Sequence, residues 1–184
     1  WLYDEDRWPS GFAGGFVTKI PQFRQKWLLF TTTQKPCATT RKASEKTDSE
    51  LLACYDVLLN DVGVLVSYSQ ISEQDHAQGK KWYVYVKYAE PSEWFNHQTY
   101  VDALNPAAIR EFIRITHEQY GKKVGDLFGK VIPAIFTDEP QVGKKGALSH
   151  AFAEEEVLLP WTTDFPDSFR QRYGTDLIPL LPEL

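Results

Sequence analysis

The sequence predicts an α/β chain in which a small antiparallel β-sheet is followed by strands and helices in alternation. Three observations predict this class. Runs of alternating apolar and polar residues fill the segment 26–90. A helix-type pattern begins at Asn105 and leads into an apolar run over 131–138. Acidic residues follow that run directly, and in parallel α/β proteins functional sites lie where strands end.

Length and composition limit the possible classes of protein. The chain has 184 residues, of which 42% are hydrophobic and 24% charged, as in ordinary globular domains, so we expect one domain with at most an appendage. The net charge of −5 argues against a nucleic-acid partner, which would favour a basic face. No apolar run approaches the ~18 residues of a membrane span.

Two further counts bear on processing and compartment. The chain starts at Trp1 and contains no methionine, which indicates a processed chain or a segment of a larger protein. No signal peptide is visible, but a segment of a larger protein need not carry one. An extracellular or periplasmic location therefore stays open. Cys37 and Cys54 fit no metal-binding spacing, and they could form a disulfide or remain free thiols.

The first residues, WLYDEDRWPSGFAGG, are predicted to form a structured loop that follows a strand, because the proline and glycines exclude a regular helix. Its three adjacent acids, Asp4, Glu5 and Asp6, repel one another unless solvent, cations or a hydroxyl-rich ligand satisfies them. The carboxylates could therefore hold a sugar, with Trp8 stacking on it, or supply oxygen ligands to Ca²⁺. The alternative is a solvated acidic turn balanced by Arg7.

The middle of the chain predicts an antiparallel sheet with one covered face. Alternating apolar residues indicate strands at 26–33, 55–59, 64–69 and 82–88. A four-residue loop, 60–63, has the composition of a hairpin connection. The segment 34–50 has almost nothing to bury and is predicted to be an exposed loop.

Helical periodicity replaces the strand pattern after Asn105, which is placed to cap a helix whose first residue is Pro106. Gly121 is expected to end this helix. The apolar run 131–138 is typical of a strand buried on both faces, with Pro133 near its start. A second helix is predicted over 165–173 and a turn or short helix over 176–184. The first helix should bury one face, made of Ile109, Phe112, Ile113, Thr116 and Tyr120.

The sharpest chemical feature is the pair Asp138 and Glu139, which follows the apolar run directly. A carboxyl group at the rim of a buried strand is partly desolvated, which raises its pKa and suits it to general-acid catalysis. One of the two acids would enter a pocket while the other accepts hydrogen bonds. The alternative is that Asp138 only caps a turn at the start of an acidic loop.

A third segment, EWFNHQTYVD over 93–102, combines aromatic rings with amide and imidazole groups. Asn96 and His97 could hydrogen-bond a ligand there. A lone histidine such as His97 is more often a satisfied structural group than a ligand-binding one. The remaining histidines share no ligand spacing, and no GxSxG nucleophile motif is present.

Three blocks of sequence together resemble large glycoside hydrolases of the α-L-rhamnosidase type, glycoside hydrolase family 106 and its relatives. They are LYDEDRWPSGFAGG, the segment 100–140 that ends in FTDEP, and WTTDFPDSFRQRYGTDLIPLLPEL. The resemblance covers about residues 1–24 and 91–184. It implies part of a catalytic (β/α)8 barrel formed by 1–25 and 91–184, with the antiparallel sheet of 26–90 inserted, inside a larger multidomain chain.

The resemblance also implies roles for residues. Glu139 matches the general acid, and Asp4, Glu5 and Asp6 would line the sugar subsite or bind the calcium ion that some members carry. From their own positions, Trp8, Asn96 and Asp138 are further candidates for contacts to the sugar. The expected substrate is a rhamnose-containing or related glycan, cleaved by a carboxylate pair. The second carboxylate is expected beyond Leu184, so the chain alone should be inactive.

Two other functions remain open on the sequence. One is a non-catalytic carbohydrate-binding module in which Trp82, Tyr83 and Tyr85 form an exposed aromatic platform on the sheet. The other is a structural domain whose acidic loops bind cations for stability alone. A hydrolase that acts on a different sugar is a third possibility, because a fold does not fix a substrate.

Overall fold

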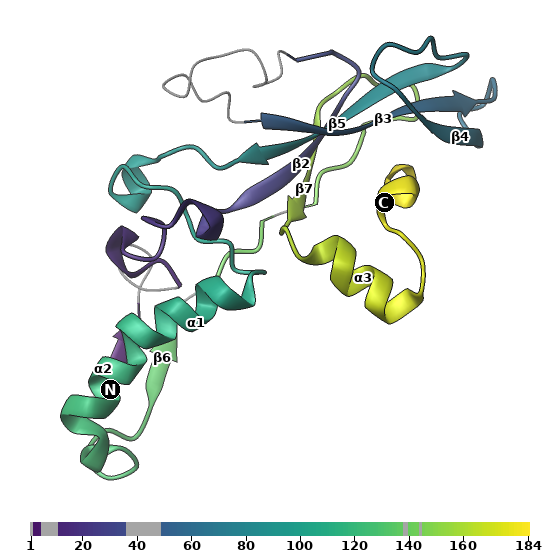
Figure 1. Ribbon diagram of the computed structural model, residues 1–184. Coiled ribbons are helices and arrows are strands. Elements are labelled where there is room, and N and C mark those ends of the chain that lie inside the picture. Colours follow the sequence, from purple (N-terminus) through teal and green to yellow (C-terminus); the bar gives the residue numbers. More distant parts are fainter. Residues whose placement is uncertain (1, 5–10, 36–48, 138–139, 144) are drawn as a thin grey trace. The chain divides into compact units, whose positions relative to one another are not determined.

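The computed structural model describes residues 2–4, 11–35, 49–137, 140–143 and 145–184 (Figure 1). By contacts the chain divides into two compact units. Unit 1 contains Trp1–Gln25 and Ala89–Val142, and unit 2 contains Lys26–Tyr88 and Gly143–Leu184. Residues 143–184, expected to belong with the first segment of the chain, thus lie in the unit that holds the sheet.

Unit 2 is built on one five-stranded sheet in which every neighbouring pair is antiparallel. The strand order across the sheet is β4-β3-β5-β2-β7. The strands are β2 (Lys26–Thr31), β3 (Ser49–Leu59), β4 (Leu65–Ile71), β5 (Lys80–Tyr88) and β7 (Val157–Trp161). The strands predicted at 26–33, 55–59, 64–69 and 82–88 are thereby confirmed, and β3 begins earlier than expected.

The predicted partial (β/α)8 barrel is wrong. The chain is organised mainly around the antiparallel sheet, and β7 joins it by pairing with β2 rather than with another parallel strand. Within the described residues, the one parallel pair of strands is β1 (Leu2–Asp4) with β6 (Ile135–Thr137), each three residues long. An apolar run followed by acids indicates a strand end, but it does not specify which strand lies beside it.

One face of the sheet carries the core of unit 2. Tyr55, Val84 and Leu28 are fully buried there, and the C-terminal residues Leu177 and Leu181 pack against them. The Tyr55 hydroxyl donates a hydrogen bond to the backbone carbonyl of Ile178. This bond fixes the C-terminal segment to the sheet, so the face is closed by residues far away in the sequence.

The C-terminal part of unit 2 is helical, as its sequence predicts. Helix α3 spans Phe165–Tyr173 and ends at Gly174, whose φ of 72° is left-handed. A 3-10 helix follows at Ile178–Glu183. Both the helix over 165–173 and the short turn over 176–184 are therefore confirmed, because a glycine stop and spaced aromatic residues are local signals.

Unit 1 combines the parallel pair β1–β6 with two helices, α1 (Pro106–Ile115) and α2 (His117–Val124). Short 3-10 helices lie at Ala13–Gly15, Pro21–Phe23, Glu93–Phe95 and Gly125–Leu127. Its core consists of Phe12, Ala13, Val17, Tyr100, Val101, Ala108 and Phe112. None of the helices in the described ranges is long and apolar enough to cross a membrane.

The start of α1 is as predicted, but its end is not. The Asn105 side chain accepts hydrogen bonds from the backbone N–H groups of Ala107 and Ala108, at 2.9 and 3.4 Å. The helix breaks at Thr116, however, and Gly121 lies inside α2 instead of ending a single helix. The expected stop at Gly121 is therefore wrong.

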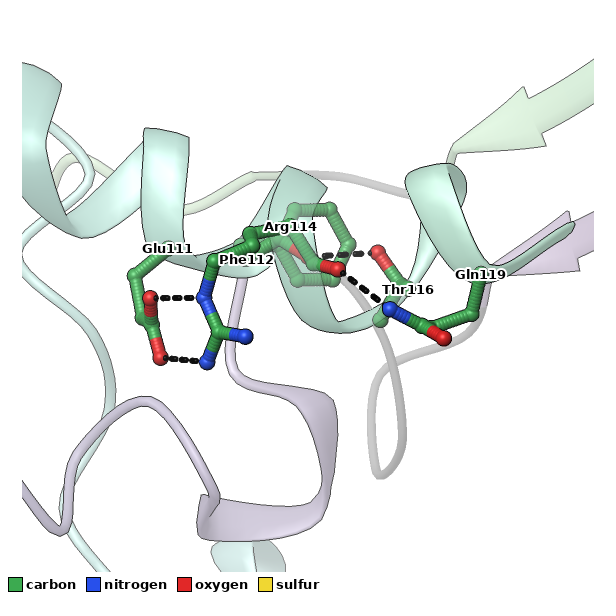
Figure 2. Close-up of polar contacts among 5 residues, drawn as sticks. All are labelled: Glu111, Phe112, Arg114, Thr116 and Gln119. Carbon is green, nitrogen blue, oxygen red and sulfur yellow. Dashed lines mark hydrogen bonds and ion pairs between the residues drawn. The ribbon is translucent and has the colours of Figure 1, made fainter. Parts of the chain in front are cut away.

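Polar contacts around the break explain it (Figure 2). The Thr116 hydroxyl donates to the backbone carbonyl of Phe112 at 2.6 Å, in addition to the helical bond from the Thr116 N–H to the same carbonyl at 3.0 Å, and a second bond of this kind bends helices. The Gln119 amide donates to the carbonyl of Arg114 at 3.2 Å and so occupies a group at the end of α1. On the exposed side, Arg114 forms two 2.7 Å bonds to Glu111, and this guanidinium lowers the pKa of the Glu111 carboxyl.

The apolar run 131–138 differs from its prediction as well. Only Ile135–Thr137 form a strand, and Ile135 and Phe136 are 44% and 41% exposed. A strand buried on both faces was expected, and that expectation is wrong for the described residues. Continuous apolar character shows that a run can be buried, but the layers needed on both faces must come from other segments.

We predict that Asn105→Ala lowers the free energy of unfolding by about 1 kcal/mol, because two N–H groups at the start of α1 lose their acceptor. Urea denaturation followed by circular dichroism measures this change. Asn105→Ser keeps a capping oxygen and serves as the control, with a smaller loss expected. Equal stabilities for Asn105→Ala and the unchanged chain would contradict the capping role.

Candidate functional site

The candidate site lies in unit 1 at the end of the parallel pair β1–β6. The register places Leu2 opposite Ile135, Tyr3 opposite Phe136 and Asp4 opposite Thr137. The Leu2 N–H donates to the carbonyl of Ala134 at 3.2 Å. Because the strands are parallel, Asp4 and Thr137 stand at the same end of the pair. The structure thus brings together two of the three segments in which the sequence predicts chemistry.

A hydrogen bond connects the third segment, 93–102, to the chain that follows β6. The backbone N–H of Gln141 donates to the hydroxyl of Tyr100 at 3.1 Å. Tyr100 is 3% exposed and belongs to the core of unit 1, so its hydroxyl is held in a fixed place. The chain that leaves β6 is therefore attached to the aromatic and amide-rich segment 93–102.

Several predicted site residues lie outside the described residues. They are Glu5, Asp6, Trp8, Asp138 and Glu139, together with Arg7. Asp4 is described as the last residue of β1, but its side chain is not. The catalytic role of Glu139 and the sugar contacts of these acids stay predictions.

Asn96 lies in a tight turn in which two consecutive residues are left-handed. Asn96 and His97 have φ values of 53° and 58° and are both exposed. Such backbone is uncommon outside glycine, although Asn and His adopt it more readily than most residues. Sequence reasoning selected these residues for their side chains and missed the backbone conformation, for which the pair Asn-His is the only local signal.

Aromatic rings of the unit 1 core pack against this turn. Phe95 lies 5.5 Å from Phe12 and 4.8 Å from Tyr100, measured between ring centroids. The loop of Gly11–Gly15 packs against the same region, since a Cβ on Gly15 would lie only 2.8 Å from the Gln98 side chain. Gly15, whose φ of 91° also favours glycine, therefore allows this loop to approach Gln98 closely.

The structure gives no independent support for a metal site. Within the ranges that the structure describes, no group of three or more His, Cys, Asp or Glu residues could hold an ion. The predicted calcium ligands Asp4, Glu5 and Asp6 contribute no described side chain. Calcium at this position stays a prediction from the sequence.

The aromatic platform proposed for a carbohydrate-binding module is contradicted. Tyr83 and Tyr85 are 8% and 0% exposed, and both pack with Leu29 and Cys54 on the second face of the sheet. The Tyr85 hydroxyl accepts a hydrogen bond from the backbone N–H of Lys35 at 2.8 Å. Trp82 precedes Tyr83 in the strand and therefore points to the opposite face. The three rings cannot form one exposed surface.

Cys54 is a buried free thiol on the same face as Tyr83, which is its partner in the β3–β5 register. Burial raises the pKa of the Cys54 thiol, although the Lys81 ammonium lowers it in part. Cys37 lies outside the described residues. A buried thiol with a raised pKa is a poor nucleophile, so Cys54 is not a catalytic candidate.

Comparisons with protein-family models, with curated proteins and with solved structures gave no match to this chain. The resemblance to rhamnosidase-type glycoside hydrolases therefore rests on the sequence blocks alone.

We expect native Cys54 to react slowly with a thiol reagent such as Ellman's reagent. In the Cys37→Ser chain, in which Cys54 is the only thiol, reaction should be slow at pH 8 and rise toward the rate of a free cysteine only in denaturant. Raising the pH should increase the native rate with a midpoint above the ordinary cysteine pKa, because burial disfavours the thiolate. Rapid reaction of the native chain at pH 8 would contradict this burial.

Proposed function

We propose that unit 1 contributes to a glycoside-hydrolysing site that acts on rhamnose-containing or related glycans, with Glu139 as the general acid. The observation that carries the proposal is the register of β1 with β6, which sets Asp4 opposite Thr137. In the sequence, acids follow both positions directly. Two acidic segments that are more than a hundred residues apart therefore start from neighbouring strand ends.

The spacing of paired strands suits the chemistry. Neighbouring strands lie about 4.8 Å apart, so acids that start at one level of a parallel pair can hold carboxyl groups several ångströms from each other. Cleavage of a glycosidic bond needs one carboxyl group that protonates the leaving oxygen and a second, expected in the rest of the larger protein, that activates water or attacks the sugar, at separations of about 5–9.5 Å. Carboxylates near Glu139 that do not react would accept hydrogen bonds from sugar hydroxyls.

The surroundings of the strand ends support a positioned site. The bond from the Gln141 N–H to Tyr100 anchors the chain two residues after Glu139 to a buried ring. The exposed Asn96 belongs to a turn that rests on that ring through Phe95. Rigid support of this kind is what an acid group needs in order to meet its substrate in one geometry.

The first test is sugar binding by the 184-residue chain. Titration with methyl α-L-rhamnoside, followed by amide NMR, should shift signals at Asp4, Thr137 and Gln141 and leave those of unit 2 strands unchanged. Glu139→Gln should preserve this binding, because the amide keeps hydrogen-bonding capacity. Absence of shifts in unit 1 at millimolar sugar would overturn the assignment of the site.

The second test is catalysis, assayed with an aryl α-L-rhamnoside and the protein in its natural full-length form. Glu139→Gln should lower kcat by at least about 100-fold, the usual contribution of a general acid, while the unfolding temperature stays unchanged. Glu118→Gln, an exposed glutamate of α2 in the same unit, is the matched control and should keep full activity. A near-normal rate for Glu139→Gln would remove Glu139 from the role.

A further inference from the structure

The sheet of unit 2 has one open edge, which is independent of the site in unit 1. In the strand order β4-β3-β5-β2-β7, β4 lies at one end, and β3 is the one strand of the described chain that pairs with it (Figure 1). In an edge strand, the backbone N–H and C=O groups of every second residue point away from the sheet. β4 therefore presents a row of donors and acceptors to which a further strand could bind.

The opposite edge of the sheet, β7, is blocked. Leu158 and Pro160 are two residues apart in this strand, so their backbone groups point to the same side. The Leu158 carbonyl accepts a hydrogen bond from the Gly146 N–H at 2.8 Å, and Pro160 has no N–H to donate. A further strand beside β7 would meet an occupied acceptor and a missing donor.

Strand β4 has none of these protections. From Leu65 to Ile71 it contains no proline and no charged residue, which are the usual means of preventing pairing at a natural sheet edge. Leu65 and Val66 are 41% and 59% exposed. The register shift of the β3–β4 pair lies at the start of the strand, between Leu65 and Ser67, so the rest of the edge, 67–71, is regular.

The sequence of β4 suits pairing with its own copy. The segment Ser67-Tyr68-Ser69 reads the same in both directions. An antiparallel pair with a two-fold axis at Tyr68 therefore places Ser67 of each copy opposite Ser69 of the other. Serine hydroxyls can hydrogen-bond across such a pair, and facing tyrosine rings pack together. A strand of a different protein would be selected by charges or side-chain pockets along the edge, and no charged residue of β4 could select it.

We propose that β4 pairs antiparallel with β4 of a second copy of this chain, about a two-fold axis near Tyr68. The two sheets then form one continuous sheet across the axis. Because the β7 edge is blocked, no third copy can add to it, and the assembly closes as a dimer instead of growing into a fibre. The paired segment is short and the interface is small, so the dissociation constant of the dimer lies in the micromolar range.

Sedimentation velocity over a wide range of protein concentration tests this proposal, under reducing conditions that prevent disulfides between copies. We expect a monomer–dimer equilibrium with no larger species. Ser69→Lys adds a charge at an exposed position of the edge and should weaken the dimer about tenfold, because the two ammonium groups repel each other across the axis. Gln171→Lys adds the same charge at an exposed position of α3 and should leave the dimer unchanged.

A mixing experiment separates this interface from a general effect of the substitution on folding. Ser69→Glu should also weaken the dimer, but an equal mixture of Ser69→Lys and Ser69→Glu should associate again as a heterodimer, because opposite charges then meet. Circular dichroism checks that each variant is folded. The proposal is overturned if the unchanged chain stays monomeric, if Ser69→Lys dimerises as tightly as the unchanged chain, or if the mixture associates no better than each variant alone. Assemblies larger than a dimer would overturn it as well.

Discussion

Strand β2 is the constraint on which unit 2 depends. Its backbone pairs with β5 on one side and with β7 on the other, in antiparallel register along nearly its whole length. These pairings join residues 26–31 to a strand that begins at Val157, so the last part of the chain is ordered by the first strand of the sheet. The C-terminal helices can close the core only because β7 has already brought the chain back to the sheet.

Local signals in the sequence were sufficient for much of this architecture. Alternating apolar residues predicted four of the strands, and Asn105 and Gly174 predicted where helices start and stop. The pairing of the strands was not predictable in this way, because nothing in the local sequence of β7 indicates an antiparallel partner more than a hundred residues earlier. The prediction that Tyr83 and Tyr85 are exposed failed for the same reason. The alternation along β5 separates two faces, but only the completed fold shows that both faces are covered.

The candidate site shows the same division between local and long-range information. Acids that follow an apolar run were visible in the sequence, and the pairing of Asp4 with Thr137 gives the two acidic segments a common origin. The hydrogen bond between Gln141 and Tyr100 was not predictable, because a tyrosine in an aromatic segment has many possible partners. Neither was the break at Thr116, where a hydroxyl and a glutamine amide donate hydrogen bonds to carbonyls at the end of α1.

The turn at Asn96 and His97 has a consequence of its own. Two successive left-handed residues without glycine cost on the order of 1–3 kcal/mol each, and the surrounding packing has to supply that energy. Backbone hydrogen bonds across the turn, such as that from the His97 N–H to the Ser92 carbonyl at 2.9 Å, contribute, as do the rings of Phe12, Phe95 and Tyr100. The aromatic packing therefore stabilises a strained backbone conformation. Loss of one of these rings would let the backbone relax, and the Asn96 amide would move from its present position.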